Sequence, residues 1–221
     1  MPHSSVHAPP RRLIVATSNP GKLREFRSLL QGVRLNGQEY ELSSLAEAGL
    51  QSPEETGDSF LANALLKARH AAQGSGQAAL ADDSGLEVDA LGGAPGVYSA
   101  RYAGDAPESA ADPDAANNAR LLRELAGKPW EQRSARYRCA LVLVDARLPA
   151  PLIAEAAWEG YILEEPRGAG GFGYDPYFWL ADRQLTAAQL GLEEKNRLSH
   201  RGRALRALRE ALLARADERR P

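Results

Sequence analysis

Apolar residues follow two patterns along the chain: short continuous runs, and stretches in which they recur every three or four positions. The continuous runs predict β-strands at residues 13–16, 78–81, 136–144 and 153–158. The helical spacing predicts helices at residues 22–30, 59–73 and 201–214, and after Asp112-Pro113. Because strands and helices are interspersed, the pattern indicates an α/β or mixed α+β fold.

The run at residues 136–144 is the strongest of the predicted strands. It is apolar on both faces over most of its length, which is typical of a strand in the centre of a sheet. The predicted strand at 78–81 is followed by two acids, Asp82 and Asp83, which we place at its end. Asp58 is expected to cap the helix that comes before this strand.

The composition argues against several classes of function. Lys and Arg number 27 and Asp and Glu number 29, so the net charge of -2 gives no general reason to bind nucleic acid or an anionic membrane. No apolar stretch approaches the roughly 20 residues of a transmembrane helix. The pair Arg11-Arg12 precedes too few apolar residues for a signal peptide. The single cysteine, Cys139, cannot form an intrachain disulfide, which favours a cytoplasmic location, and we expect it to be a buried filler.

The length of 221 residues suits one large domain or two lobes that share a core. We expect residues 1–11 to form a disordered N-terminal extension and residues 216–221 to form a frayed tail. Residues 12–215 then form a single domain.

The first candidate site is the polar loop of residues 17–22, Thr-Ser-Asn-Pro-Gly-Lys, between a strand and a helix. Free backbone N–H groups and the helix dipole favour an anion at such a position, and Lys22 adds a cation. The spacing differs from that of a Walker A loop. Taken alone, the segment is equally compatible with a phosphate-binding loop and with an ordinary turn.

The second candidate is the acidic pair, Asp82 and Asp83. Adjacent carboxylates beside an apolar strand are costly to bury unless they are paired or bind a metal. Hard oxygen ligands without histidine or thiolate favour Mg²⁺ over zinc. An acidic turn is the alternative. Glu54 or Glu55, which come before the helix predicted at residues 59–73, could reach the same metal or could interact only with the dipole of that helix.

Three further motifs carry residues that could bind a nucleotide, and each also has a structural explanation. Lys67 could neutralise phosphate or be a solvated lysine. The glycine-rich loop at residues 170–175 could stack its aromatic residue on a base or bury it in the core. His200 and Arg201 could donate to a carbonyl or phosphate, or could form a surface cap.

The order of these motifs decides between the alternatives. Seven motifs occur in sequence, at residues 17–22, 54–57, 63–68, 81–86, 92–102, 170–176 and 199–202. The series resembles the inosine/xanthosine triphosphate pyrophosphatase family, also called the XTP/dITP diphosphatases, from residue 13 to about residue 213. Ser18 departs from the glycine of many relatives, and the N-terminal extension has no counterpart.

The resemblance implies a long, twisted, mixed sheet flanked by helices, in two lobes with the active cleft between them. It also implies Mg²⁺, a homodimer and a cut between the α and β phosphates. Asp83 matches the general base and metal ligand, and Glu54 and Asp82 are the further metal-linked acids that we assign. The predicted substrate-binding residues are Thr17, Ser18, Asn19, Pro20, Gly21, Lys22, Lys67, Ser84, Phe172, Gly173, Tyr174, Asp175, Lys195, His200 and Arg201.

The predicted function is hydrolysis of abnormal purine nucleoside triphosphates, namely ITP, dITP and XTP, to the monophosphate and pyrophosphate. The small-molecule nucleotide is then the expected partner, and nucleic acid and membrane are not. Phe172 is expected to stack on the purine, with Lys195, His200 and Arg201 around its C6 edge. One alternative is a pyrophosphatase for another modified nucleotide, such as a pyrimidine. The other is a nucleotide-binding regulator without catalysis.

Overall fold

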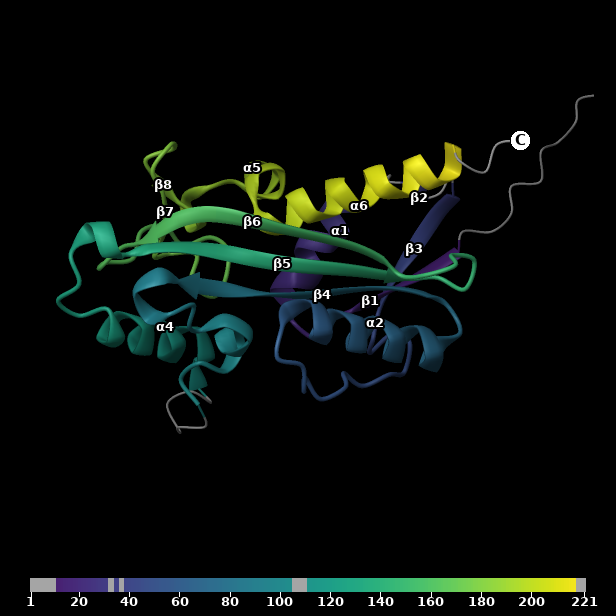
Figure 1. The fold of residues 1–221 in the computed structure, drawn as a ribbon, viewed down its shortest axis with the longest axis horizontal. Coiled ribbons are helices and arrows are strands. Elements are labelled where there is room, and N and C mark those ends of the chain that lie inside the picture. The colour runs from purple at the N-terminus through teal and green to yellow at the C-terminus, as the bar shows by residue number, and fades with distance from the viewer. Residues whose placement is uncertain (1–10, 32–33, 36–37, 105–110, 218–221) are drawn as a thin grey trace, which may run out of the picture.

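A mixed β-sheet forms the centre of the molecule (Figure 1). The computed structural model describes residues 11–31, 34–35, 38–104 and 111–217. Within these ranges the sheet has eight strands in the order β2-β3-β1-β4-β5-β6-β7-β8. The strands are β1 (Arg11–Ala16), β2 (Arg34–Leu35), β3 (Gln38–Ser44), β4 (Ala78–Val88), β5 (Ser134–Val144), β6 (Leu152–Ile162), β7 (Phe178–Leu180) and β8 (Leu185–Thr186).

Both parallel and antiparallel pairs occur in this sheet. β1 pairs in parallel with β3 and with β4, whereas β4, β5, β6, β7 and β8 pair antiparallel in turn. β5 lies between β4 and β6, as its apolar faces predict. The predicted fold class, a mixed sheet flanked by helices, is therefore confirmed.

Helices cover both faces of the sheet (Figure 1). The α-helices are α1 (Pro20–Leu29), α2 (Phe60–Ser75), α4 (Pro113–Glu124), α5 (Leu192–Leu198) and α6 (His200–Asp217). Short 3₁₀ helices are η1 (Asp89–Leu91), η2 (Gly96–Arg101), η3 (Trp130–Gln132) and η4 (Ala187–Gln189). α1 and α6 pack on one face, and α2 and α4 lie against the other. Within the described residues, no helix has the length and hydropathy needed to cross a membrane.

The three longest strands, β4, β5 and β6, run through separate apolar cores. Near β1, the core on one face joins these strands to α1 and α6, and the core on the opposite face joins β4 and β5 to α2. Near β7, a further core contains Leu121 of α4, Trp158 and Phe178. Because β4 and β5 contribute to every one of these cores, the described residues fold around one continuous sheet.

The structure corrects several predicted boundaries. β4 does not end before the acidic pair but continues through it to Val88. The N-cap of α2 is Ser59 rather than Asp58, because the Ser59 side chain accepts a hydrogen bond from the N–H of Ala62. The Asp112 cap and the proline at the first turn of α4 are confirmed.

The predicted ends of the domain also shift. β1 begins at Arg11, which we had assigned to the N-terminal extension. α6 reaches Asp217, so residues 216–217 belong to the helix and not to a frayed tail. Residues 1–10 and 218–221 lie outside the described residues.

Candidate active site

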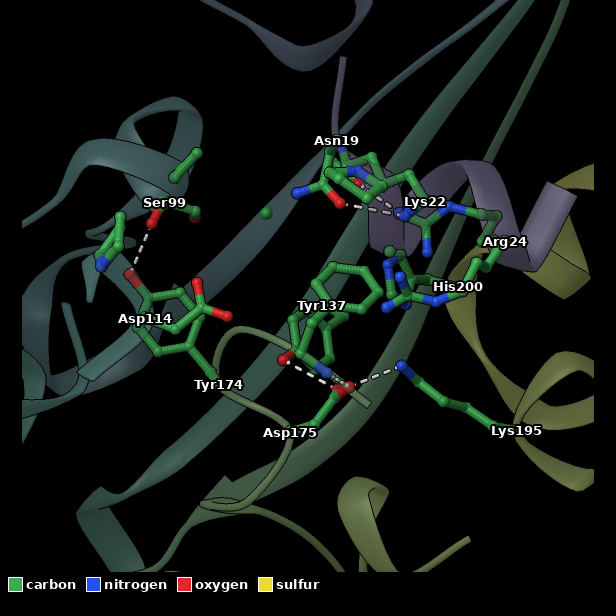
Figure 2. Close-up of a pocket in the computed structure, with 18 of the residues that line it drawn as sticks. Asn19, Lys22, Arg24, Ser99, Asp114, Tyr137, Tyr174, Asp175, Lys195 and His200 are labelled. Atoms are coloured by element: carbon green, nitrogen blue, oxygen red, sulfur yellow. Dashed lines mark hydrogen bonds and ion pairs between the residues drawn. The ribbon is translucent and has the colours of Figure 1, made fainter. Parts of the chain in front are cut away.

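A pocket of about 480 Å³ is lined by residues from five of the seven motifs (Figure 2). It lies between the start of α1, the middle of β4, the start of α4 and the junction of α5 and α6. The predicted residues that line it are Asn19, Pro20, Gly21, Lys22, Ser84, Phe172, Tyr174, Asp175, Lys195, His200 and Arg201. Segments more than 170 residues apart, at Asn19 and Arg201, therefore meet in one place.

The loop between β1 and α1 is ordered by its own side chains. The side chain of Thr17 accepts from the N–H of Asn19 at 3.1 Å. Asn19 is the N-cap of α1, and its Oδ1 accepts from the N–H of Lys22 at 3.0 Å. Ser18 is exposed and Pro20 occupies the first turn. The remaining free N–H groups and the positive end of the helix dipole favour an anion in the pocket.

Asp82 and Asp83 point to opposite faces of the sheet. Both lie inside β4, where successive side chains alternate between the two faces. Asp82 contacts residues of α1 and α6, and Asp83 contacts residues of α2. The two carboxylates therefore belong to separate clusters and do not form the paired metal site that we predicted from their adjacency.

Asp82 is fully engaged by donors from the protein. It accepts from Lys22 Nζ at 2.6 Å, Arg201 Nε at 3.0 Å, Ser84 Oγ at 2.8 Å and Cys139 Sγ at 3.2 Å. Burial opposes ionisation, but Arg201 and Lys22 outweigh it and hold the pKa of Asp82 well below its usual range. Asp82 is a buried carboxylate held by four protein donors, and its assignment as a metal ligand stays a prediction.

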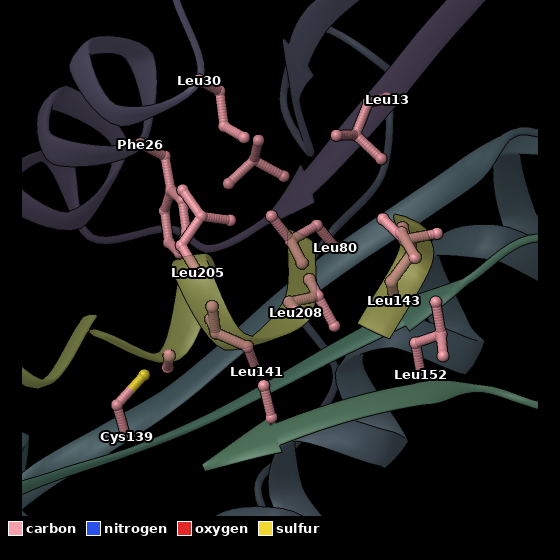
Figure 3. Close-up of a cluster of buried hydrophobic side chains, with 14 residues drawn as sticks. Leu13, Phe26, Leu30, Leu80, Cys139, Leu141, Leu143, Leu152, Leu205 and Leu208 are labelled. Atoms are coloured by element: carbon pink, nitrogen blue, oxygen red, sulfur yellow. The ribbon is translucent and has the colours of Figure 1, made fainter. Parts of the chain in front are cut away.

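Cys139 is buried beside Leu141, as predicted for a filler residue (Figure 3). Its thiol also contacts Asp82, and burial raises the pKa of the thiol well above its usual value. The thiol therefore stays protonated and acts as a hydrogen-bond donor, a role that the apolar surroundings in the sequence did not reveal.

Asp83 forms a second cluster with two residues of α2 that lie four positions apart, Asn63 and Lys67. Its Oδ1 lies 2.6 Å from Lys67 Nζ, and its Oδ2 accepts from Asn63 Nδ2 at 3.3 Å. Lys67 is buried, so it is not a solvated surface lysine. Burial raises the pKa of Asp83, against the lowering effect of Lys67 and Lys22. A carboxylate with a raised pKa is suited to accept a proton.

Of the two glutamates Glu54 and Glu55, Glu55 contacts the cluster around Asp83. Glu55 Oε1 lies 2.9 Å from Lys67 Nζ, and Arg101 approaches its other oxygen at 3.2 Å. Burial opposes ionisation of Glu55, but Lys67 and Arg101 lower its pKa. Glu54 is exposed. Glu55 therefore replaces Glu54 as the acid nearest to Asp83.

The cluster offers the donor chemistry of a magnesium site. Asp83 and Glu55 each direct one carboxylate oxygen to the same positive centre, the ammonium group of Lys67. Mg²⁺ is commonly bound by one or two carboxylates with water and phosphate completing its shell. No group of three His, Cys, Asp or Glu residues that could hold a metal occurs among the described residues. Two carboxylates thus fit Mg²⁺ better than a metal that needs a closed protein site.

A chain of buried ion pairs extends from Arg201 to Asp175. Arg201 contacts Glu25, whose other oxygen lies 2.7 Å from Lys195 Nζ. Lys195 lies 2.6 Å from Asp175, and Tyr137 donates to the same carboxylate at 3.2 Å (Figure 2). Each link satisfies a charge that would be costly to bury alone.

Glu25 was missed by the sequence analysis. It is buried, and although burial opposes its ionisation, Arg201 and Lys195 lower its pKa. The signal was present in the helical spacing, because Glu25 lies three residues after Lys22 and four before Leu29, on the inward side of α1. Tyr137 lies in the strand predicted at residues 136–144, and the sequence pattern did not mark it as part of a site.

On the side where Phe172 and His200 lie, aromatic rings line the pocket. His200 stacks on Tyr137 with ring centroids 4.8 Å apart, and Phe172 lies over Lys195 Nζ at 4.7 Å. Tyr174 donates to the carbonyl of Ser99 at 2.7 Å. These contacts place Phe172 and His200 in one pocket, as predicted.

The polar groups on this side are not equally available. Arg201 donates from Nε to Asp82, from one terminal nitrogen to Glu25 and from the other to Ser84. Arg201 lines the pocket with its donors engaged by protein groups, and its contact with the base edge stays a prediction. His200 Nδ1 is buried without a hydrogen-bond partner within the described part of the chain. Burial, together with Arg201, lowers the pKa of His200 well below its usual value, so the ring is neutral near pH 7.

Comparison with known proteins agrees with the order of motifs. The chain matches the Ham1 family over residues 13–211. It is 51% identical over 203 residues to a dITP/XTP pyrophosphatase of Xylella fastidiosa, covering 91% of this chain and 97% of that protein. It is 52% identical over 205 residues to a dITP/XTP pyrophosphatase of Methylococcus capsulatus, covering 92% and 97%.

Solved structures show the same fold. A HAM1 protein from Coxiella burnetii superposes with a TM-score of 0.78 at 43% identity, covering 92% of this chain and 99% of that one. The Ham1 protein of Staphylococcus aureus gives a TM-score of 0.77 at 33% identity, covering 93% and 100%. These similarities extend over nearly the whole chain, and the chain belongs to the Ham1 family.

Proposed function

We propose that the protein hydrolyses abnormal purine nucleoside triphosphates, namely ITP, dITP and XTP, to the nucleoside monophosphate and pyrophosphate. One observation carries the proposal: a single pocket has an anion-binding helix start with Lys22 at one side and aromatic rings with an unpartnered polar atom of His200 at the other. The names of the relatives, dITP/XTP pyrophosphatases, support the same substrate class.

The reaction requires a water molecule to attack the α-phosphorus while pyrophosphate leaves. Asp83 accepts the proton of this water, and the new P–O bond forms as the α–β bridging bond breaks. Such general-base catalysis typically contributes about 10²- to 10⁴-fold in rate. Lys22 and Lys67 supply positive charge near the phosphate oxygens, where negative charge builds up. Bound Mg²⁺, held by Asp83 and Glu55, would add further neutralisation of the phosphates.

We expect activity to depend on Mg²⁺ or Mn²⁺ and to gain little from zinc. The reason is that Asp83 and Glu55 offer hard oxygen ligands without thiolate or imidazole. The measurement is ITP turnover after exhaustive EDTA treatment and after adding back each metal. Full turnover by the metal-free enzyme would exclude the metal site.

Base selection is assigned to Phe172 and His200. The Phe172 ring provides a flat apolar surface on which any purine can stack. The neutral His200 ring carries one N–H, and we propose that Nδ1, which has no protein partner within the described residues, donates it to the base. A C6 carbonyl, as in inosine and xanthosine, accepts this bond, whereas the amine of adenine leaves two donors facing each other.

Gly21→Ala is expected to weaken all purine substrates together. A β-carbon at Gly21 would lie 2.6 Å from Cδ1 of Phe172, so the ring must move. Loss of a base–aromatic stack typically costs about 1–3 kcal/mol, roughly 5- to 150-fold in kcat/KM. The matched control is Gly191→Ala, where a β-carbon meets no atom within 4 Å. Equal kcat/KM values for ITP in both variants would show that the Phe172 position is not limiting.

The test of the function is a panel of ITP, dITP, XTP, the standard triphosphates and modified pyrimidine triphosphates, with phosphate and pyrophosphate measured separately. We expect pyrophosphate from the first three substrates. Preference for a modified pyrimidine would favour the alternative of a pyrophosphatase for another nucleotide. Binding without turnover would favour the regulator.

We also propose that the protein is a cytoplasmic homodimer. The family resemblance and the cysteine content support these assignments, and neither affects the chemistry above. Sedimentation velocity at micromolar concentration tests the dimer, and cell fractionation tests the location.

A further inference from the structure

The loop that carries Phe172 is held by the first two turns of α4. Gly173 donates its N–H to Oδ2 of Asp114 at 2.6 Å, and its carbonyl accepts from Nδ2 of Asn118 at 2.9 Å. Both polar groups of one loop residue are thus bound by side chains four positions apart, on one face of the helix. Gly173 is the residue directly after the ring that faces the pocket.

The helix side of this contact is itself fixed. Asn118 is buried, and its Nδ2 donates also to the backbone carbonyl of Asp114 at 2.8 Å. The Asp112 cap and Pro113 set the start of α4. On the other side of the ring, the N–H of Phe172 donates to Asp175 at 2.9 Å. The backbone around Phe172 is therefore held at both ends.

Behind the loop there is space into which it could withdraw. A cavity of about 470 Å³ lies between α4 and the loop, and its walls include Ala115, Leu122, Gly170 and Tyr177. Gly171 and Gly173 both have positive φ, so the loop contains residues that tolerate large backbone changes. The two hydrogen bonds to Gly173 tie the part of the loop next to Phe172 to α4, across this space.

We infer that Asp114 and Asn118 are positioning residues that hold Phe172 in place for stacking on the base. The inference deepens the proposed function and rests on it. It assigns to α4 a role in binding the base half of the nucleotide and none in binding its phosphates. Because the bond from Gly173 ends on a carboxylate, it belongs to the stronger class of charge-assisted hydrogen bonds.

The test separates the two halves of the substrate. Inosine monophosphate probes the base half and inorganic tripolyphosphate the phosphate half, each by equilibrium titration against wild type and Asp114→Ala. Asp114 is exposed, so the variant is expected to fold. We expect the Kd of inosine monophosphate to rise about five- to tenfold, within the range of a lost stack, and the Kd of tripolyphosphate to stay unchanged. A general loss of structure would weaken both.

A double-mutant cycle tests whether Asp114 acts through the ring. In a Phe172→Ala background, Asp114→Ala should have no further effect on inosine monophosphate binding. Asp114→Asn keeps an acceptor for the N–H of Gly173 and should restore most of the affinity. Arg123→Ala, exposed on the same helix, is the matched control and should match wild type.

The outcomes distinguish this inference from the proposed function. If the wild type does not hydrolyse ITP, the function is wrong, whatever the titrations show. Additive effects in the cycle, equal weakening of both probes, or unchanged affinity in Asp114→Ala would each overturn the positioning role while leaving hydrolysis intact.

Discussion

Asp83→Asn should lower kcat for ITP by about 10²- to 10⁴-fold while leaving the fold intact. Asparagine has nearly the same shape, and its amide oxygen can still accept from Lys67, so the contacts to α2 largely persist. What is lost is the carboxylate that takes the proton from water. Steady-state kinetics with ITP and circular dichroism measure the two effects separately.

The neighbouring acids supply the comparison for this experiment. Glu54→Gln, at an exposed acid outside the cluster, should behave as wild type. Glu55→Gln should reduce turnover and raise the Mg²⁺ concentration required, because Glu55 shares Lys67 with Asp83. In the wild type, kcat/KM should fall at acid pH as Asp83 becomes protonated, with the midpoint above the usual aspartate pKa because burial raises it. A folded Asp83→Asn enzyme with wild-type kcat would refute the general base.

The second large effect is expected on stability. Asp82→Ala should reduce the free energy of unfolding by about 3–5 kcal/mol, the typical cost of breaking a buried ion pair by removing one partner. The change leaves Lys22 without its carboxylate and removes one of the two carboxylates that hold Arg201. Both cations are largely buried, so water cannot fully replace the lost partner. Urea denaturation provides the measurement.

Asp89→Ala is the matched control, because Asp89 forms a more exposed pair with Arg136. Its loss should cost at most about 1 kcal/mol. The two variants should also differ in their pH dependence. Since the pKa of Asp82 is lowered on folding, its contribution is present above the unfolded value of about 3.9 and is lost as the pH falls below it. Asp82→Ala should therefore show a shallower loss of stability in acid. Equal costs at both positions would exclude a special role for the buried pair.

The sequence predicted the fold class and most of the residues that line the pocket, because turns, glycines and helix starts are local signals. The loop at residues 17–22 and the ring of Phe172 are examples. The acidic pair was misplaced for a physical reason. Two charged residues directly after an apolar run indicate that the strand has ended. They can lie inside the strand only when oppositely charged partners elsewhere in the fold compensate them. For Asp82 that partner is Arg201, 119 positions away, and no local pattern contains it.

Residues that act through distant partners were missed for the same reason. In the sequence, Glu25 is one glutamate in a helix with many polar residues, and only the fold brings Lys195 and Arg201 into contact with it.

Gly202 is a residue whose structural role the sequence analysis did not reveal. It lies in the last of the seven motifs, and the structure shows that any β-carbon there would overlap the carbonyl oxygen of Asn196. That glycine allows the close approach of α5 and α6.

The buried ion pairs also explain how one pocket can hold three cationic side chains close together. Three cations, Lys22, Lys195 and Arg201, would repel one another if they were gathered only to await an anion. Asp82, Glu25 and Asp175 lie between them, so positive and negative charges alternate and sum to zero. Self-repulsion is thereby removed before any nucleotide arrives, and the protein can fold in its absence.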